Sequence, residues 1–105
     1  MNDTYTHYFD APGVDDPRAF AATLVGDCMT PEYRDGDLAV FPPDAEVTDG
    51  CAVFVELANG FITFKRIRLG DKITLVPDNP AHKARTFDDA EIARVVRCVA
   101  VYRLV

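Results

Sequence analysis

Two adjacent residues near the middle of the chain, Asn59 and Gly60, separate two segments that are rich in β-branched and aromatic residues. These segments are residues 51–57 (CAVFVEL) and 61–68 (FITFKRIR). Asn-Gly between two such runs is the strongest short-range signal for a β-hairpin, because a two-residue hairpin turn of this type needs positive φ at both positions. The pair therefore predicts an antiparallel hairpin at the centre of the chain.

Further β-rich segments, separated by turns, lie on both sides of this hairpin. Strands are expected at residues 20–25 (where the alanines also permit a helical turn), 38–41, 73–77 and 94–105, and a turn of helix or an edge strand at residues 86–93. One short helix is predicted at residues 29–34, since Pro31 is tolerated in a first helical turn. About five to seven short strands with frequent turns predict a mostly β domain, built as a barrel or a bent sheet.

The chain has 105 residues, which is enough for one domain with a single sizeable core. Residues 1–19 are polar and interrupted by proline and glycine, so we expect an N-terminal arm or loop, followed by a folded domain at residues 20–105. The arm carries Tyr5, Tyr8 and Phe9. These aromatic residues are expected either to pack on a folded domain or to belong to a partly ordered terminus.

The overall charge and the cysteines narrow the classes of function. The net charge is −6, which argues against direct binding to nucleic acid. No apolar run approaches the ~20 residues that span a bilayer, and the N-terminal residues do not resemble a signal peptide. Cys28, Cys51 and Cys98 are an odd number of widely spaced thiols, so no disulfide framework is predicted and the reducing cytoplasm is the expected location.

Cys28 is a candidate nucleophile because it lies in GDCMTP, residues 26–31, a pattern typical of a turn that leads into a helix. Unpaired backbone N–H groups at such a position lower the pKa of a thiol, and the same groups can hold an oxyanion. The alternative is a small apolar residue that fills space below the turn, since most free cysteines are buried and unreactive.

Lys65 is a second candidate, because it lies within a predicted strand. Alternation along this strand places Phe61, Thr63, Lys65 and Ile67 on one face and Ile62, Phe64, Arg66 and Arg68 on the other. Each face mixes charge with apolar groups, so at least one cation is expected to lie partly against the core. A lysine that loses its water can become neutral and take a proton from a nucleophile. The alternative is a lysine that extends to solvent at a sheet edge.

Histidines and metal-binding patterns offer weaker candidates. His7 and His82 could each pair with Cys28, but nothing in their spacing brings either histidine close to it. Three cysteines and His82 could also form a zinc or redox site, but the chain has no Cys-x-x-Cys pair. The sequence therefore predicts neither a metal site nor a cofactor.

Four segments of the chain resemble, in order, those of the LexA-like peptidases, which include phage repressor C-terminal domains, UmuD-type proteins and, more distantly, signal peptidases. FAATLVGDCMTPEYRDGDLAVF (20–41) resembles their nucleophile segment, an apolar strand followed by Gly-Asp, a Ser-Met-x-Pro turn, a second Gly-Asp and another strand. DGCAVFVELANGFITFKRI (49–67), ITLVPDNPAH (73–82) and RVVRCVAVYR (94–103) resemble the later blocks. The resemblance covers roughly residues 18–104 and implies a mostly β, LexA-like bent sheet with one short helix.

The resemblance also implies a set of site residues. In the family a serine is the nucleophile and a neutral lysine the base, and the reaction cleaves the protein's own chain or a partner chain. Cys28 occupies the serine position and Lys65 the lysine position, and the backbone N–H of Cys28 would belong to the oxyanion hole. The positions that match the motif around the two turns are Gly26, Asp27, Met29, Pro31, Asp35, Gly36 and Asp37.

Two departures from the family pattern decide the expected function. First, a cysteine replaces the serine. Second, the family cleaves an Ala-Gly or Cys-Gly bond upstream of the nucleophile and carries a DNA-binding helix-turn-helix before it, and the residues before Cys28 contain neither feature. We therefore expect a regulatory or dimerisation module without efficient self-cleavage. It would form a homodimer in which residues 94–105 offer an apolar strand for pairing. A protein substrate and a separate DNA-binding chain are the two further partners that the sequence leaves open. The alternative is an active peptidase in which Cys28 and Lys65 cleave a partner protein.

Overall fold

The computed structural model describes residues 3–11 and 16–103, apart from the side chains of residues 6–9. These residues form nine strands and one short 3₁₀ helix, which confirms the predicted mostly β fold. The elements are β1 Tyr5–Asp10, β2 Phe20–Leu24, β3 Leu38–Phe41, β4 Ala52–Leu57, β5 Ile62–Arg68, β6 Ile73–Val76, β7 Arg85–Phe87, η1 Asp89–Glu91, β8 Ile92–Arg97 and β9 Ala100–Tyr102. No helix within this part of the chain is long and apolar enough to cross a membrane.

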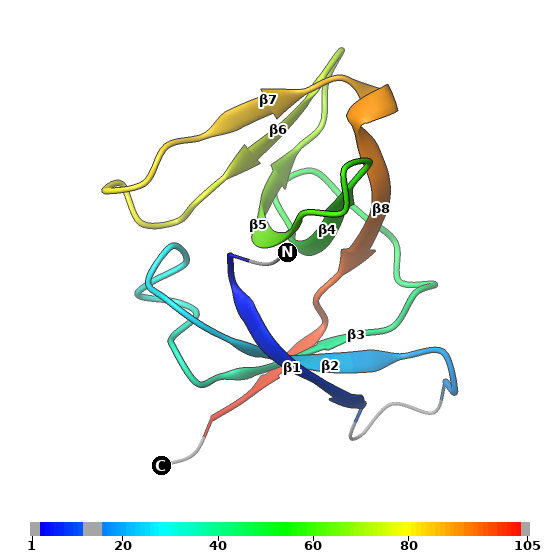
Figure 1. The fold of residues 1–105 in the computed structure, drawn as a ribbon, viewed down its shortest axis with the longest axis vertical. Coiled ribbons are helices and arrows are strands. Elements are labelled where there is room, and N and C mark those ends of the chain that lie inside the picture. Colours follow the sequence, from blue (N-terminus) through cyan, green and yellow to red (C-terminus); the bar gives the residue numbers. More distant parts are fainter. Residues whose placement is uncertain (1–2, 12–15, 104–105) are drawn as a thin grey trace.

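The strands form two antiparallel sheets that lie one above the other in Figure 1. The four-stranded sheet has the order β1-β2-β3-β9, and the five-stranded sheet has the order β7-β6-β5-β4-β8. A first core cluster, rich in aromatic rings, joins the two sheets and includes Phe41 from one and Phe54 and Phe64 from the other. A second cluster covers the opposite face of the five-stranded sheet and includes Val53 and Val55.

The N-terminal segment is a strand and not the predicted arm or loop. Residues 5–10 pair with β2, with Tyr5 opposite Leu24. Tyr5 is only 4% exposed, because its ring packs against Phe41, Phe54 and Phe64 in the first cluster. Burial of an aromatic ring outweighs the polar character of the neighbouring residues. The side chains of His7, Tyr8 and Phe9 lie outside the described part, so the expectations for them stay predictions.

The central hairpin is confirmed, but its turn differs from the prediction. Strands β4 and β5 pair from Ala52↔Arg66 to Glu56↔Ile62. Of the two residues predicted to form the turn, Gly60 has positive φ (88°) and Asn59 does not. The loop has three residues and not two, because the Gly60 N–H donates to the Leu57 carbonyl at 2.9 Å and closes a turn before the glycine. A turn followed by one left-handed glycine is the usual form of a three-residue hairpin loop.

The helix predicted at residues 29–34 is wrong. This segment forms consecutive turns, although the Tyr33 N–H does donate to the Met29 carbonyl at 2.9 Å. A proline disfavours helical backbone in the residue before it, so Thr30 interrupts a helix that would have to include Pro31. The short helix lies instead at η1, directly after β7. An edge strand and a turn of helix, the two alternatives expected for residues 86–93, are therefore both present.

The C-terminal segment forms two short strands and not the one long strand predicted at residues 94–105. Strand β8 pairs with β4 in one sheet, and β9 pairs with β3 in the other. The Cys98 N–H donates to the Ala52 carbonyl at 2.9 Å, whereas the next N–H, that of Val99, donates to the Val40 carbonyl at 3.0 Å. Strand β4 begins at Ala52, so the chain must find its next hydrogen-bond partners on β3, and it passes from one sheet to the other here (Figure 1).

Candidate active site

Cys28 lies in a tight turn directly after β2. Gly26 has a φ of 82°, a left-handed conformation that favours glycine, and its N–H donates to Asp35 Oδ1 at 2.9 Å. The N–H and the hydroxyl of Thr30 both donate to the Asp27 carbonyl, at 3.2 and 2.9 Å. These bonds hold Cys28 half-buried in the middle of the turn.

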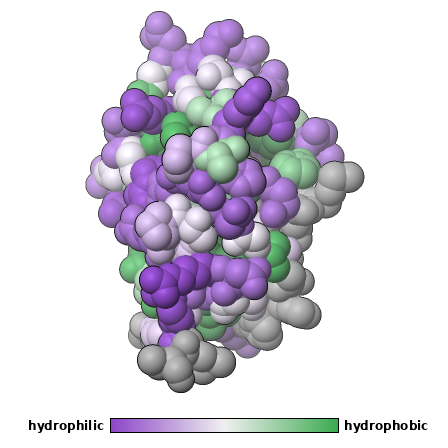
Figure 2. Space-filling model, turned by 90° about the vertical axis from the view of Figure 1, so that its left-hand side faces the viewer, coloured by the Kyte–Doolittle hydropathy of each residue, from purple (hydrophilic) through white to green (hydrophobic). Residues whose placement is uncertain are grey.

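The loop between β6 and β7 is tied to this turn. The Asn79 N–H donates to the Cys28 carbonyl at 3.0 Å, and the Asn79 amide donates to the Asp27 carbonyl, also at 3.0 Å. The side of the molecule toward which both segments extend is largely hydrophilic (Figure 2). The positioning role of Asn79 was missed in the sequence analysis. The only signal for it was its place in PDNPAH, within the third block of the resemblance.

The same loop brings His82 to Cys28. His82 Nδ1 lies 3.7 Å from Cys28 Sγ, and His82 Nε2 lies 2.7 Å from Asp27 Oδ1. A carboxylate only accepts hydrogen bonds, so in the neutral imidazole this contact assigns the proton to Nε2 and leaves the lone pair of Nδ1 directed at the thiol. A nucleophile, a base and a group that orients the base are therefore in contact, the arrangement required for an activated cysteine.

The backbone N–H groups of Asp27, Cys28 and Met29 are candidate donors for an oxyanion. Within residues 3–11 and 16–103, no atom accepts a hydrogen bond from the Cys28 N–H. The family resemblance assigned this N–H to the oxyanion hole. Such a hole requires a hydrogen-bond donor that is not already bonded to another acceptor. In the same part of the chain, no group of three or more His, Cys, Asp or Glu side chains is arranged as a metal site.

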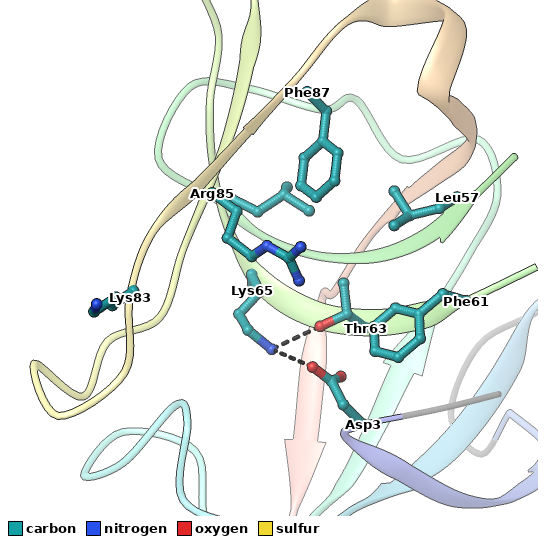
Figure 3. A pocket seen from close by; sticks show the side chains of 9 residues that line it. Asp3, Leu57, Phe61, Thr63, Lys65, Lys83, Arg85 and Phe87 are labelled. Atoms are coloured by element: carbon teal, nitrogen blue, oxygen red, sulfur yellow. Dashed lines mark hydrogen bonds and ion pairs between the residues drawn. The ribbon is translucent and has the colours of Figure 1, made fainter. Parts of the chain in front are cut away.

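Lys65 is buried in β5, with 9% of the residue exposed. Its Nζ donates to Thr63 Oγ1 at 2.6 Å, to Asp3 Oδ2 at 3.3 Å and to Thr4 Oγ1 at 3.4 Å. Figure 3 shows the amine directed at Thr63 and Asp3, beside a small cavity of about 40 Å³. The cation expected to lie against the core is therefore Lys65. A lysine ammonium has three N–H donors, and all three have acceptors here.

The two candidates of the family dyad are not joined by a hydrogen bond within the described residues. Cys28 packs at the margin of the first core cluster, which includes Phe64. Lys65 is the next residue after Phe64 and pairs with Val53 of the second cluster, so its side chain leaves the opposite face of β5. The Cys28–Lys65 pair stays a prediction from the resemblance, whereas the contact with His82, which spacing could not predict, is present.

Arg66, next to Lys65 but on the other face of β5, fixes the loop that carries Asn79 and His82. Its guanidinium donates to both carboxylate oxygens of Asp78 at 2.9 Å, and to Glu32 at 2.9 Å. The hydrogen bonds to Asp78 are the main cause of the raised pKa of Arg66. A bidentate pair of this kind orients as well as attracts. Arg66 therefore holds one end of the loop against β5.

Asp37, one of the motif positions, has a structural role. It is 1% exposed, and it accepts hydrogen bonds from the Arg34 N–H at 2.8 Å and from Arg103 at 2.6 and 2.7 Å. The hydrogen bonds from Arg103 are the main reason that the pKa of Asp37 is lowered, against the opposing effect of burial. Asp37 therefore links the turn after Gly36 to the end of β9.

A family model described as Peptidase S24-like matches residues 2–99. No curated protein matches the chain. The matched range includes Cys28, Lys65 and His82, and it covers strands from both sheets.

Proposed function

This chain belongs to the Peptidase S24-like family, and on that premise we propose that it is a peptidase-fold regulatory module that does not efficiently cleave its own chain. The observation that carries the proposal is the set of contacts made by Lys65. Its amine donates to Thr63, Asp3 and Thr4 and is not hydrogen-bonded to Cys28 in the described residues. A base must direct its lone pair at the nucleophile, whereas the Lys65 amine is directed at Thr63, Asp3 and Thr4.

The alternative is a Cys28–Lys65 peptidase that cleaves a partner chain. The Cys28 N–H favours this alternative, because it has no acceptor within the described residues and could hold an oxyanion. For this chemistry Lys65 would have to leave Thr63 and Asp3 and reach the thiol from the other face of β5. Misplacement near 1 Å costs about 10²-fold in rate, so the contacts support the module over the peptidase.

A homodimer is part of the proposal. Strand β9 ends the order of the four-stranded sheet, so one of its edges faces no other strand of the described chain. Val99 and Tyr102, at either end of β9, are 48% and 47% exposed. A free edge flanked by apolar side chains favours pairing with a second copy. We also propose a cytoplasmic location, which suits the three free thiols, and a separate DNA-binding chain as the regulated partner.

Proteolysis in trans separates the module from the alternative. Unfolded casein is incubated with the wild type and with Cys28→Ala, and casein loss is followed by electrophoresis. We expect no difference between the two proteins. Cys28-dependent loss of casein would overturn the proposal, and if Lys65→Met abolished that loss as well, the alternative would replace it.

A further inference from the structure

The thiol of Cys28 has a base that the family's serine–lysine chemistry does not use. We propose that Cys28 is an acyl-accepting nucleophile, activated by His82 and independent of Lys65, for acyl groups carried on good leaving groups such as thioesters and aryl esters. The inference does not depend on the proposed regulatory role, because it concerns the reactivity of one side chain.

Two contacts carry the inference. In the neutral imidazole, the 2.7 Å contact between His82 Nε2 and Asp27 Oδ1 keeps the proton on Nε2, so Nδ1, 3.7 Å from Cys28 Sγ, can accept the thiol proton. A thiol reacts as its thiolate, and a neighbouring imidazole supplies that form at neutral pH. Asp27 is a positioning residue, because it touches the imidazole and not the reacting sulfur.

The β6–β7 loop is held well enough to keep this geometry. Asn79 ties the loop to Asp27 and to the Cys28 carbonyl, and the Arg66–Asp78 pair ties it to β5. The Asp78 N–H also points at Met29 Sδ at 3.4 Å. Three separate attachments therefore fix the segment from which His82 approaches the thiol.

The reaction is a simple transfer. Cys28 Sγ forms a bond to the acyl carbonyl carbon while its proton passes to His82 Nδ1. The bond between the carbonyl carbon and the leaving sulfur or oxygen then breaks, and the leaving group takes that proton. The products are a Cys28 thioester and a free thiol or phenol, so no oxidant or reductant is needed.

The surroundings select the class of acyl donor. The site is open to water, with 38% of the His82 side chain and 68% of the Asp27 side chain exposed. Donors for the oxyanion are present, since the N–H groups of Asp27, Cys28 and Met29 have no acceptor within the described residues. Electrostatic stabilisation of a tetrahedral intermediate by these donors is nevertheless weak at a site open to water. An amide needs that stabilisation more than a thioester or an aryl ester does, because its leaving group is poorer.

The chain contains its own control thiols. Cys51 is half-buried and free like Cys28, but among the side chains that the structure describes it has no hydrogen bond to a histidine. Burial raises the pKa of Cys98 to about 11, so this thiol is a second, slower reference. A comparison within one molecule removes differences in concentration and folding between samples.

The experiment measures acetylation by p-nitrophenyl acetate at pH 7, with the modified thiols identified by peptide mapping. We expect Cys28 to react at least about 10-fold faster than Cys51, and His82→Gln to remove that advantage. Asp27→Asn should shift the pH dependence of the Cys28 rate toward that of Cys51, which a purely structural role would not do. Thermal melting of each variant confirms that it is folded.

Three results would overturn the inference: equal rates at Cys28 and Cys51 in the wild type, a Cys28 rate that survives His82→Gln in a folded protein, or a loss of the same size in Lys65→Met. The last result would assign the thiol proton to the lysine. None of these results bears on dimerisation or on cleavage of casein, so the two proposals succeed or fail separately.

Discussion

At the scale of single residues, the environment of a side chain decides its role more than its place in a motif. Cys28 and Asp37 occupy motif positions one and ten residues after Asp27. One is a half-buried thiol beside a histidine, whereas the other is a buried carboxylate bonded to Arg103. Both residues can be identified from the motif, but their opposite surroundings depend on residues more than fifty positions away.

Asp37 gives a prediction about stability and pH. The Arg103 hydrogen bonds keep its pKa below the ordinary 3.8, so its contribution is present above that pH and is lost as the pH falls through the lowered value. We expect Asp37→Asn to lower the unfolding free energy by about 2 kcal/mol at pH 7, and by less as the solution becomes more acidic. Urea titrations at pH 7 and pH 3 measure this.

The matched control for that prediction is Asp71→Asn, at an exposed aspartate. Its effect should stay within about 0.5 kcal/mol. An equal effect of the two substitutions, or a loss at Asp37 that does not change with pH, would show that the Asp37–Arg103 pair does not stabilise the fold.

At the scale of elements, local pattern predicts strands but not their ends or partners. Residues 38–41 form a strand as predicted, and the central hairpin lies where Asn59-Gly60 placed it. The split of residues 94–105 into β8 and β9 depends on where β4 and β3 end, which no local pattern records. For the same reason, the sequence could name His82 as a possible partner of Cys28 but could not predict that the two side chains are in contact.

The glycine of the central hairpin gives a prediction at this scale. Gly60 has a φ of 88°, which an L-residue adopts only at a cost, although a Cβ there would meet no neighbour. Gly60→Ala should therefore lower the unfolding free energy by about 1 kcal/mol. Gly70→Ala is the control, because Gly70 has no positive φ and its Cβ would meet only an ordinary contact at 3.7 Å. Similar chemical-denaturation midpoints for the two variants would contradict the backbone argument.

At the scale of the whole molecule, the candidate site forms where segments from the two sheets meet. The Cys28 turn follows β2 of the four-stranded sheet, and His82 lies between β6 and β7 of the five-stranded sheet. Lys65 likewise connects β5 to Asp3, just before β1. A mostly β fold could be predicted from the sequence, but this convergence depends on how the sheets pack, which is a property of the complete core.

The proposed dimer is tested at the same scale. We expect the wild type to be a dimer by light scattering at tens of micromolar, and Val99→Lys to shift it toward monomer, because a charge beside the free edge of β9 opposes pairing. Leu69→Lys is the matched control: Leu69 is 47% exposed, close to the 48% of Val99, but it lies beyond β5 in the other sheet. A monomeric wild type, or dissociation by Leu69→Lys alone, would contradict the proposed interface.

The central claim is that Lys65, bound by Thr63 and Asp3, does not serve as a base for self-cleavage. Intact-mass spectrometry of the purified chain over days in alkaline buffer, which favours thiolate and neutral amine, tests it most directly. We predict that the wild type and Cys28→Ser, which restores the family's nucleophile, both keep their full mass. Accumulation of two complementary fragments in either protein, abolished by Lys65→Met, would contradict the account.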